Sequence, residues 1–198
     1  MIARKNVGVA LAVALVSTAA AGCASQSAAF RQMTATDHEA AARTTTDSSL
    51  AEEHVEAARK LRDQERAECY GVSDTDRDLG PFARTDAVTG VEVVRDHGVF
   101  PKGALQPVGV SVYLRAESGM TQQWLGRVVA CHMAHVAVVG QEPRQTPITV
   151  PNADVTVSST QVGFRVTITS KDGDAARSVV ERGRQLAASS PTTIAWNN

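Results

Sequence analysis

The densest group of potential metal ligands, Cys131, His132 and His135, lies within five consecutive residues. Residues 120–139 contain no proline and repeat apolar residues at helical spacing, so we expect a helix there. On this helix both imidazoles turn toward the apolar side, where an unpaired polar group costs about 1 to 3 kcal/mol. Thiolate and imidazole ligands suit copper or zinc. The pattern allows a copper or zinc site, and also two hydrogen-bonded core histidines beside a structural cysteine, which we favour.

The cysteine count offers a second interpretation that excludes the metal site. Of the three cysteines, Cys23 belongs to the leader described below, which leaves Cys69 and Cys131. In an oxidising compartment two such cysteines usually pair. A bridge would close a loop of about 60 residues and contribute about 3 to 4 kcal/mol in the chain-entropy model. Because a bridged sulfur cannot bind metal, we expect either the Cys69–Cys131 disulfide or a metal site that includes Cys131.

Other candidate residues do not form a catalytic pattern. Asp74, Asp76 and Asp78 alternate as at the start of a calcium loop, but the glycine and the closing glutamate of that loop are absent. We therefore expect a solvated turn or a helix cap there. His97 follows Asp96 with no nucleophile beside it, and no nucleophile elbow, phosphate loop or dinucleotide fingerprint occurs. We expect no enzymatic activity, and rank a hydrolase built around His97 below both a binding module and a metal-binding protein.

The first 22 residues have the layout of a secretion signal. A basic head is followed by an uncharged apolar run, Val7 to Val16, and then by small residues. The run is shorter than the roughly 20 residues that a membrane span needs. Ala20-Ala21-Gly22-Cys23 resembles the lipobox of bacterial lipoproteins, and ordinary secretion with a free Cys23 thiol is the alternative. The resemblance implies that Cys23 is fatty-acylated, for example with palmitate, and becomes the new N-terminus.

An acylated Cys23 would attach the protein to a membrane without spanning it. Several acyl chains on one residue make such anchoring effectively permanent. Ala24 stands where an aspartate would mark inner-membrane retention, so the resemblance implies the periplasmic face of the outer membrane if the cell is Gram-negative. The chain has 20 basic and 21 acidic residues, a balance that gives no electrostatic basis for nucleic-acid binding.

Composition divides the remaining chain into segments. Residues 23–48 are rich in Ala, Ser, Thr and Gln, with few large apolar side chains, and are expected to form a flexible tether. Ser49 and Glu52 have the form of a capping box, which predicts a helix over residues 49–70. Residues 71–190 are expected to form the folded domain, and 191–198 a short tail.

Within residues 71–190 the hydrophobic pattern repeats. Apolar residues alternate in two predicted strands and then take helical spacing, and a second unit follows the same plan. When the sequence is aligned with itself at an offset of 54 residues, Gly109 matches Gly163 and Ser118 matches Asp172. Serine and aspartate are both residue types that cap helices. We therefore predict an α+β fold in which a tandem strand-strand-helix repeat forms a four-stranded antiparallel sheet covered by two helices, preceded by an N-terminal helix.

Three stretches of this domain carry a further resemblance. They are Glu68 to Phe82, the tryptophan-containing helix from Trp124 to His132, and the strand from Gly163 to Ile168. Together they resemble uncharacterised lipoproteins of myxobacteria and their relatives over most of residues 60–185. That family carries no assigned activity, so the resemblance supports the domain and names no reaction.

These observations predict a membrane-anchored, non-enzymatic binding or scaffolding module of the cell envelope, with a protein partner in the envelope. The alternative is an envelope protein that binds copper or zinc through Cys131, His132 and His135.

Overall fold

The computed structural model describes residues 29–96, 105–140 and 146–190. The leader, Cys23, His97 and the 191–198 tail lie outside the described residues, so the predictions that concern them stay predictions. The structure divides between Gln32 and Met33, and every element named below belongs to the part that begins at Met33. No helix of the described ranges is both long and apolar enough to cross a membrane.

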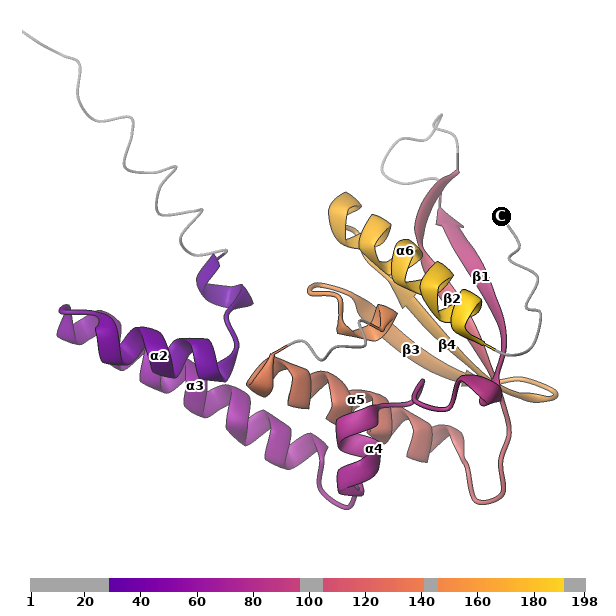
Figure 1. Cartoon of the computed structure of the whole chain (residues 1–198), viewed down its shortest axis with the longest axis horizontal. Coiled ribbons are helices and arrows are strands. Elements are labelled where there is room, and N and C mark those ends of the chain that lie inside the picture. The colour runs from indigo at the N-terminus through magenta and orange to yellow at the C-terminus, as the bar shows by residue number, and fades with distance from the viewer. Residues whose placement is uncertain (1–28, 97–104, 141–145, 191–198) are drawn as a thin grey trace, which may run out of the picture. The chain divides into compact units, whose positions relative to one another are not determined.

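A four-stranded antiparallel sheet forms the centre of the domain, in the strand order β1-β2-β4-β3. Each pair of consecutive strands is followed by a helix, as the repeat predicts (Figure 1). The predicted α+β fold is confirmed. The elements of the two units are β1 (Val88–Asp96), β2 (Gln106–Arg115), α5 (Gln122–Val139), β3 (Asp154–Ser159), β4 (Gly163–Thr169) and α6 (Gly173–Ser189), with the short helix η2 (Pro147–Thr149) between α5 and β3.

The pairing of β2 with β4 follows the 54-residue repeat. Val112 pairs with Val166, which is its own equivalent one repeat later. Gly109 and Gly163 are also equivalent residues of the two repeats, and they lie at opposite ends of the β2–β4 pairing. The two units are therefore related by an approximate twofold axis through the Val112–Val166 pair.

Both repeat glycines allow the two central strands to approach each other. A side chain at Gly109 would collide with the backbone carbonyl of Ile168, and one at Gly163 with that of Leu114. Such contacts with backbone atoms cannot be relieved by a side-chain rotation. Glycine is therefore required at both positions, which explains why the repeat retains it twice.

One face of the sheet carries the apolar core. Alternate residues of β2 and β4 are buried on this face, while the opposite face carries polar contacts such as the 3.1 Å hydrogen bond between the hydroxyls of Ser111 and Thr167. Helix α6 packs on β1 and β2, and Gly183 permits a close approach to Val110. The largest fully buried side chains of the cluster are Leu125, Ile148, Ile168, Val88, Val91, Val110, Val112, Val166 and Val179.

The predicted N-terminal helix is present as α3 (Ser48–Glu68). Its N-cap is Asp47, whose carboxylate accepts hydrogen bonds from the backbone N–H groups of Ser49 and Leu50. The Ser49–Glu52 capping box is therefore wrong. Aspartate is as good a helix cap as serine, so the helix begins one residue earlier than predicted.

The predicted tether is wrong over residues 35–44, which form helix α2 (Ala35–Thr44). Thr34 and Asp37 make a reciprocal capping box at its start. Ala35 is fully buried and packs with Ala58 of α3 and Val138 of α5. Alanine is common in tethers, but it also favours helices and allows them to pack closely while burying little apolar surface.

The polar segment that follows α3 contains the helix α4 (Asp74–Leu79) and the short helix η1 (Thr85–Ala87). At the start of α5 the N-cap is Thr121, so the predicted cap at Ser118 is wrong, whereas Asp172 caps α6 as predicted. Thr121 provides the same hydroxyl chemistry three residues later, at the point where the helical backbone begins.

Candidate functional site

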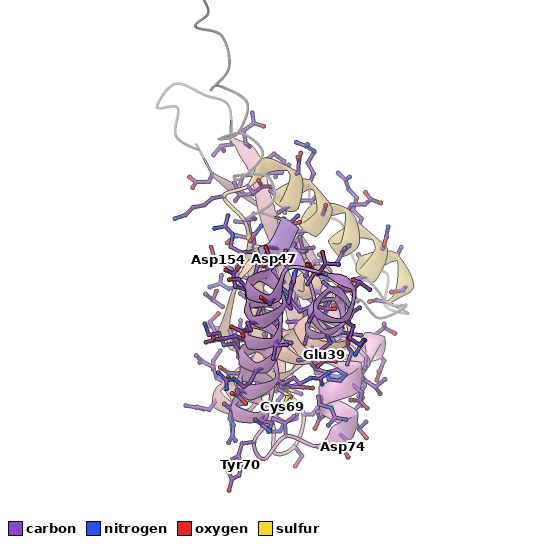
Figure 2. The ribbon with its side chains drawn as sticks, turned by 90° about the vertical axis from the view of Figure 1, so that its left-hand side faces the viewer. Glu39, Asp47, Cys69, Tyr70, Asp74 and Asp154 are labelled. Carbon is purple, nitrogen blue, oxygen red and sulfur yellow. A yellow bond between two sulfur atoms is a disulfide. The ribbon has the colours of Figure 1, made fainter. Side chains whose placement is uncertain are left out.

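A disulfide ties the end of α3 to the middle of α5. Cys69 directly follows α3, Cys131 lies on α5, and the bond joins positions 62 residues apart in sequence. The Cys131 side chain is fully buried. Figure 2 shows Cys69 in the same part of the molecule as Tyr70, at the end of α3, and Asp74, at the start of α4. The predicted Cys69–Cys131 disulfide is confirmed.

His132 joins α5 to the end of α4. Its Nδ1 lies 2.7 Å from the backbone carbonyl oxygen of Arg77, and its side chain is buried. Because a carbonyl oxygen only accepts, Nδ1 carries the proton and donates it. A Cβ added at Gly80 would lie 2.7 Å from the ring, so only glycine leaves room for the imidazole. Gly80 also has a φ of 68°, and it follows the last residue of α4.

His135 lies between two carboxylates on different helices. Its Nδ1 is 2.6 Å from Oε1 of Glu65 on α3, and its Nε2 is 3.6 Å from Oδ1 of Asp78 on α4. The Arg77 guanidinium, which donates to Asp78, holds the pKa of that carboxyl below its usual value, and the two histidines contribute in the same direction. We call the disulfide together with the His132 and His135 contacts the helix clasp, because it attaches both α3 and α4 to α5.

The three-ligand copper or zinc site predicted as the alternative is wrong, because its sulfur ligand, Cys131, is used up in the disulfide. The Nδ1 atoms of His132 and His135 are directed to different partners on different helices. Nowhere in the part of the chain that the structure describes do three or more His, Cys, Asp or Glu side chains form a group that could hold a metal ion. The favoured interpretation, two hydrogen-bonded histidines beside a structural cysteine, agrees with the geometry.

The N-cap of α4 is Ser73, and the three alternating aspartates lie within the helix. Asp74 and Asp76 lie in its first turn, where carboxylates favour the positive end of the helix. The Ser73 hydroxyl accepts the backbone N–H of Asp76, and Asp74 pairs with Arg77 at 3.0 Å. These side chains therefore stabilise the short helix that the clasp holds against α5.

The two helices α4 and α5 enclose a pocket of about 190 Å³. Leu79 and Gly80 contribute its α4 side, Trp124 and Val128 its α5 side, and Leu114 of β2 also lines it. Leu79 is 50% exposed and Trp124 37% exposed, although both are large apolar side chains. The clasp fixes α4 relative to α5, so it also fixes the shape of this pocket. We call it the α4–α5 pocket.

Paired charges lie at the margin of the α4–α5 pocket. Arg84 and Glu117 both line it, and the Arg84 Nη1 donates to the Glu117 Oε2 at 2.6 Å. A second carboxylate, Asp86, lies 3.7 Å from the same guanidinium. The third charged residue of the lining, Asp76, accepts a hydrogen bond from the Ser73 hydroxyl at 2.7 Å. Most of the remaining lining is apolar, so the pocket suits an uncharged apolar group.

Two histidines that sequence reasoning missed form a buried contact between α2 and α3. Nδ1 of His38 lies 2.9 Å from Nδ1 of His54. Both residues are at most 7% exposed. The missed signal is that each imidazole stands among alanines at helical spacing, which marks a narrow interface once residues 35–44 are recognised as a helix.

Comparisons of the chain with family models, with curated proteins and with solved structures each find no match.

Proposed function

We propose that the protein is a lipid-anchored, non-enzymatic binding or scaffolding module of the cell envelope. The anchor is the acyl group on Cys23, which the likeness of residues 20–23 to a lipobox supports. The folded part from α2 to α6 then lies on the periplasmic side of the membrane. The resemblance to myxobacterial-type lipoproteins supports the same assignment without giving an activity.

The single observation that carries this proposal is the Cys69–Cys131 disulfide, in which the Cys131 side chain is fully buried. Structural disulfides persist outside the reducing cytosol, in secreted and periplasmic proteins. The Cys69–Cys131 bond attaches the end of α3 to α5. His132 and His135, which follow Cys131 on α5, contact α4. A protein whose helical layer depends on such a bond is suited to the compartment to which the leader directs it.

The binding activity of the module is assigned to the α4–α5 pocket. Its volume of about 190 Å³ is below the roughly 300 Å³ at which pockets for drug-sized ligands begin. It is large enough for one aliphatic or aromatic side chain. Binding energy in protein interfaces concentrates where such a side chain fills a pocket. We therefore assign the pocket to an apolar side chain of an envelope protein, with Leu79 and Trp124 making the surrounding contact.

The anchor is tested by labelling cells with radioactive palmitate. Label is expected in the native protein and not in Cys23→Ser, and globomycin is expected to leave the precursor uncleaved. Cys131→Ser serves as the matched control, because it removes a cysteine and should retain the label. A native protein without label, or a precursor that globomycin does not affect, would overturn the anchor.

The binding site is tested by photo-crosslinking in cells. A photoreactive residue at position 79 is expected to give a discrete adduct with one envelope protein, and Trp124→Ala is expected to abolish it. The control position is Val162, which is 81% exposed in the turn between β3 and β4. Equal adducts from positions 79 and 162, or an adduct that is unaffected by Trp124→Ala, would contradict the assignment.

A further inference from the structure

The carboxylates at the margin of the α4–α5 pocket outnumber the basic groups that pair with them. Arg84 serves two carboxylates, since it lies 2.6 Å from Glu117 and 3.7 Å from Asp86. Arg115 also contacts Asp86, at 3.8 Å. The remaining carboxylate, that of Asp76, lines the pocket from α4. Three carboxylates and two guanidinium groups therefore leave this margin with one negative charge in excess.

The excess charge belongs to Asp76. Its Oδ2 accepts a hydrogen bond from the Ser73 hydroxyl at 2.7 Å, and its Oδ1 has no such partner among the described residues. The other two aspartates of α4 differ, because Asp74 and Asp78 both pair with Arg77, at 3.0 Å and 2.7 Å. Asp76 is thus the one carboxylate of α4 for which the described part of the chain provides no basic partner.

Apolar side chains lie beside Asp76 in the same pocket lining. Leu79 follows Asp76 by three positions on α4, so the two residues share one side of this helix. Trp124 lines the pocket from α5, and both apolar side chains are exposed. A partner that covers them gains binding free energy in proportion to the apolar area that it removes from water. The pocket therefore combines an exposed apolar surface with an unpaired carboxylate.

Other basic groups nearby do not reverse this charge. Arg77, which pairs with the two other aspartates of α4, does not line the pocket. Arg127 of α5 does not line it either, and its guanidinium donates to the backbone carbonyl of Tyr70. The only basic residue in the lining is Arg84, which already has carboxylate partners. Asp76 is therefore available to a basic group from outside the chain.

The chemistry of the pocket margin restricts what can cover it. A purely apolar partner would remove water from the Asp76 carboxylate without replacing its interactions, which opposes binding. A partner with a basic group at this point avoids that cost, whereas an acidic partner adds repulsion. An exposed ion pair changes affinity by a factor of about 1.5 to 5. The carboxylate therefore selects among apolar partners and does not supply most of the binding free energy.

We propose that the α4–α5 pocket recognises a basic segment of an envelope protein. In this segment an apolar side chain enters the pocket, and a neighbouring lysine or arginine pairs with Asp76. The inference rests on the proposed function for the existence of a protein partner, and it adds the chemistry by which that partner is selected. A segment with the same apolar side chain and no basic residue binds less tightly, because it leaves Asp76 unpaired.

The charge preference is tested with two small probes, benzylamine and benzyl alcohol. Both carry the same aromatic ring, and only benzylamine is positively charged at neutral pH. The full chain is titrated with each probe, and the NMR signals of α4 and of the first turns of α5 report the two affinities. The quantity compared between variants is the ratio of the benzylamine affinity to the benzyl alcohol affinity, which removes the contribution of the ring.

Asp76→Asn is expected to lower this ratio by a factor of about 1.5 to 5. Asparagine keeps an oxygen that can accept the Ser73 hydroxyl, so the start of α4 should remain folded. The matched control is Asp74→Asn, which removes the same charge from the same helical turn but outside the pocket lining, and should leave the ratio nearly unchanged. Equal ratios in the native chain and Asp76→Asn, an equal fall in the control, or no response of α4 and α5 to either probe would overturn the proposal.

The protein partner is tested through the adduct formed by a photoreactive residue at position 79. Mass spectrometry of the adduct should find a lysine or arginine within about four residues of the attached partner residue, the spacing over which side chains meet on a helix. Asp76→Lys should lower the adduct yield more than Asp74→Lys does. Absence of any adduct would count against the proposed function. An adduct that lacks a nearby basic residue and is unaffected by Asp76→Lys would leave that function intact and overturn the basic partner.

Discussion

The sheet with α6 and the layer of α2, α3 and α4 are stabilised by different kinds of interaction. In the first region, valine, leucine, isoleucine and phenylalanine side chains of β1, β2 and β4 belong to one buried cluster, and the partly buried Val155 and Val157 of β3 pack against it. In the second, the apolar cluster consists of Ala35, Ala58 and Val138, and α3 is overall strongly polar. What holds the second region is a disulfide, four histidines and ion pairs.

This difference determines what each region responds to. An apolar cluster depends little on redox state or on pH between about 5 and 8, because it contains no group that titrates or is reduced there. The disulfide depends on redox state. Burial and the neighbouring His54 lower the pKa of His38, so acid weakens the contact that this residue makes. The two regions should therefore respond differently to reductant or acid. The sheet should stay folded, while the layer of α2, α3 and α4 should lose part of its folded structure. The α4–α5 pocket lies between them, since its walls come from both.

The largest effect should come from the close approach of β2 and β4. Gly109→Ala places a methyl group against the carbonyl oxygen of Ile168, and we expect a loss of about 4 kcal/mol or more in the free energy of unfolding. Gly126→Ala on α5 is the matched control. Because nothing lies within 4 Å of its added Cβ, this change should be neutral or stabilise the helix by about 0.5 to 1 kcal/mol. Chemical denaturation measures both; equal stabilities for the two variants would show that the strands can separate without cost.

Removal of the disulfide should have the next largest effect, confined to the helical layer. Cys69→Ser/Cys131→Ala is expected to lose about 3 to 4 kcal/mol, because the unfolded loop is no longer closed. Amide exchange should increase in α3 and α4 and stay unchanged in β2 and β4. Reductant should reproduce this change in the native chain and have no effect on the double variant. A uniform increase across the sheet would show that the two regions unfold together.

Loss of the His132 contact should be smaller and local to α4. His132→Ala leaves the Arg77 carbonyl without its imidazole donor, which we expect to cost about 1 to 3 kcal/mol. Val139→Ala, on an exposed position of the same helix, should change stability by less than about 0.5 kcal/mol. Thermal unfolding measures both. In His132→Asn the amide can donate to the same carbonyl, so this variant should be more stable than His132→Ala. Equal stability of the two variants would argue against the hydrogen bond.

The smallest effect should come from the Glu39–Arg62 ion pair. The two side chains are 2.7 Å apart but substantially exposed, so a double-mutant cycle of Glu39→Gln and Arg62→Ala should give a coupling of about 0.2 to 1 kcal/mol. Added salt should reduce the coupling further. A value above about 2 kcal/mol would place more of the α2 docking energy in this pair than in the histidines and alanines.

The sheet could be predicted from the sequence because its signal is local. Alternating valines mark half-buried strands, and the 54-residue repeat predicts two strand-strand-helix units that share one sheet. That the equivalent residues Val112 and Val166 also pair across β2 and β4 is known only from the structure. The burial of His132 and the partial burial of His135 also followed from their positions on a helix. The disulfide followed from the number of cysteines and the leader.

The helical layer was predicted less well because its contacts join distant residues. The partners of His132 and His135 are Arg77 and Glu65, which lie 55 and 70 positions away in sequence. Nothing in the local pattern indicates a backbone carbonyl as the partner of an imidazole. Helix α2 was missed since its interface is made of alanines, which the composition of a tether also contains.

The Cys69–Cys131 bond supports the proposed envelope location and joins α3 to α5 in the helix clasp. The direct measurement is peptide mass spectrometry of the full chain, isolated from cells with thiols blocked at lysis and without reductant. We expect one linked peptide that contains Cys69 and Cys131, with neither residue alkylated. Recovery of Cys131 as an alkylated free thiol in the folded protein would contradict the clasp, and with it the assignment of this domain to an oxidising envelope.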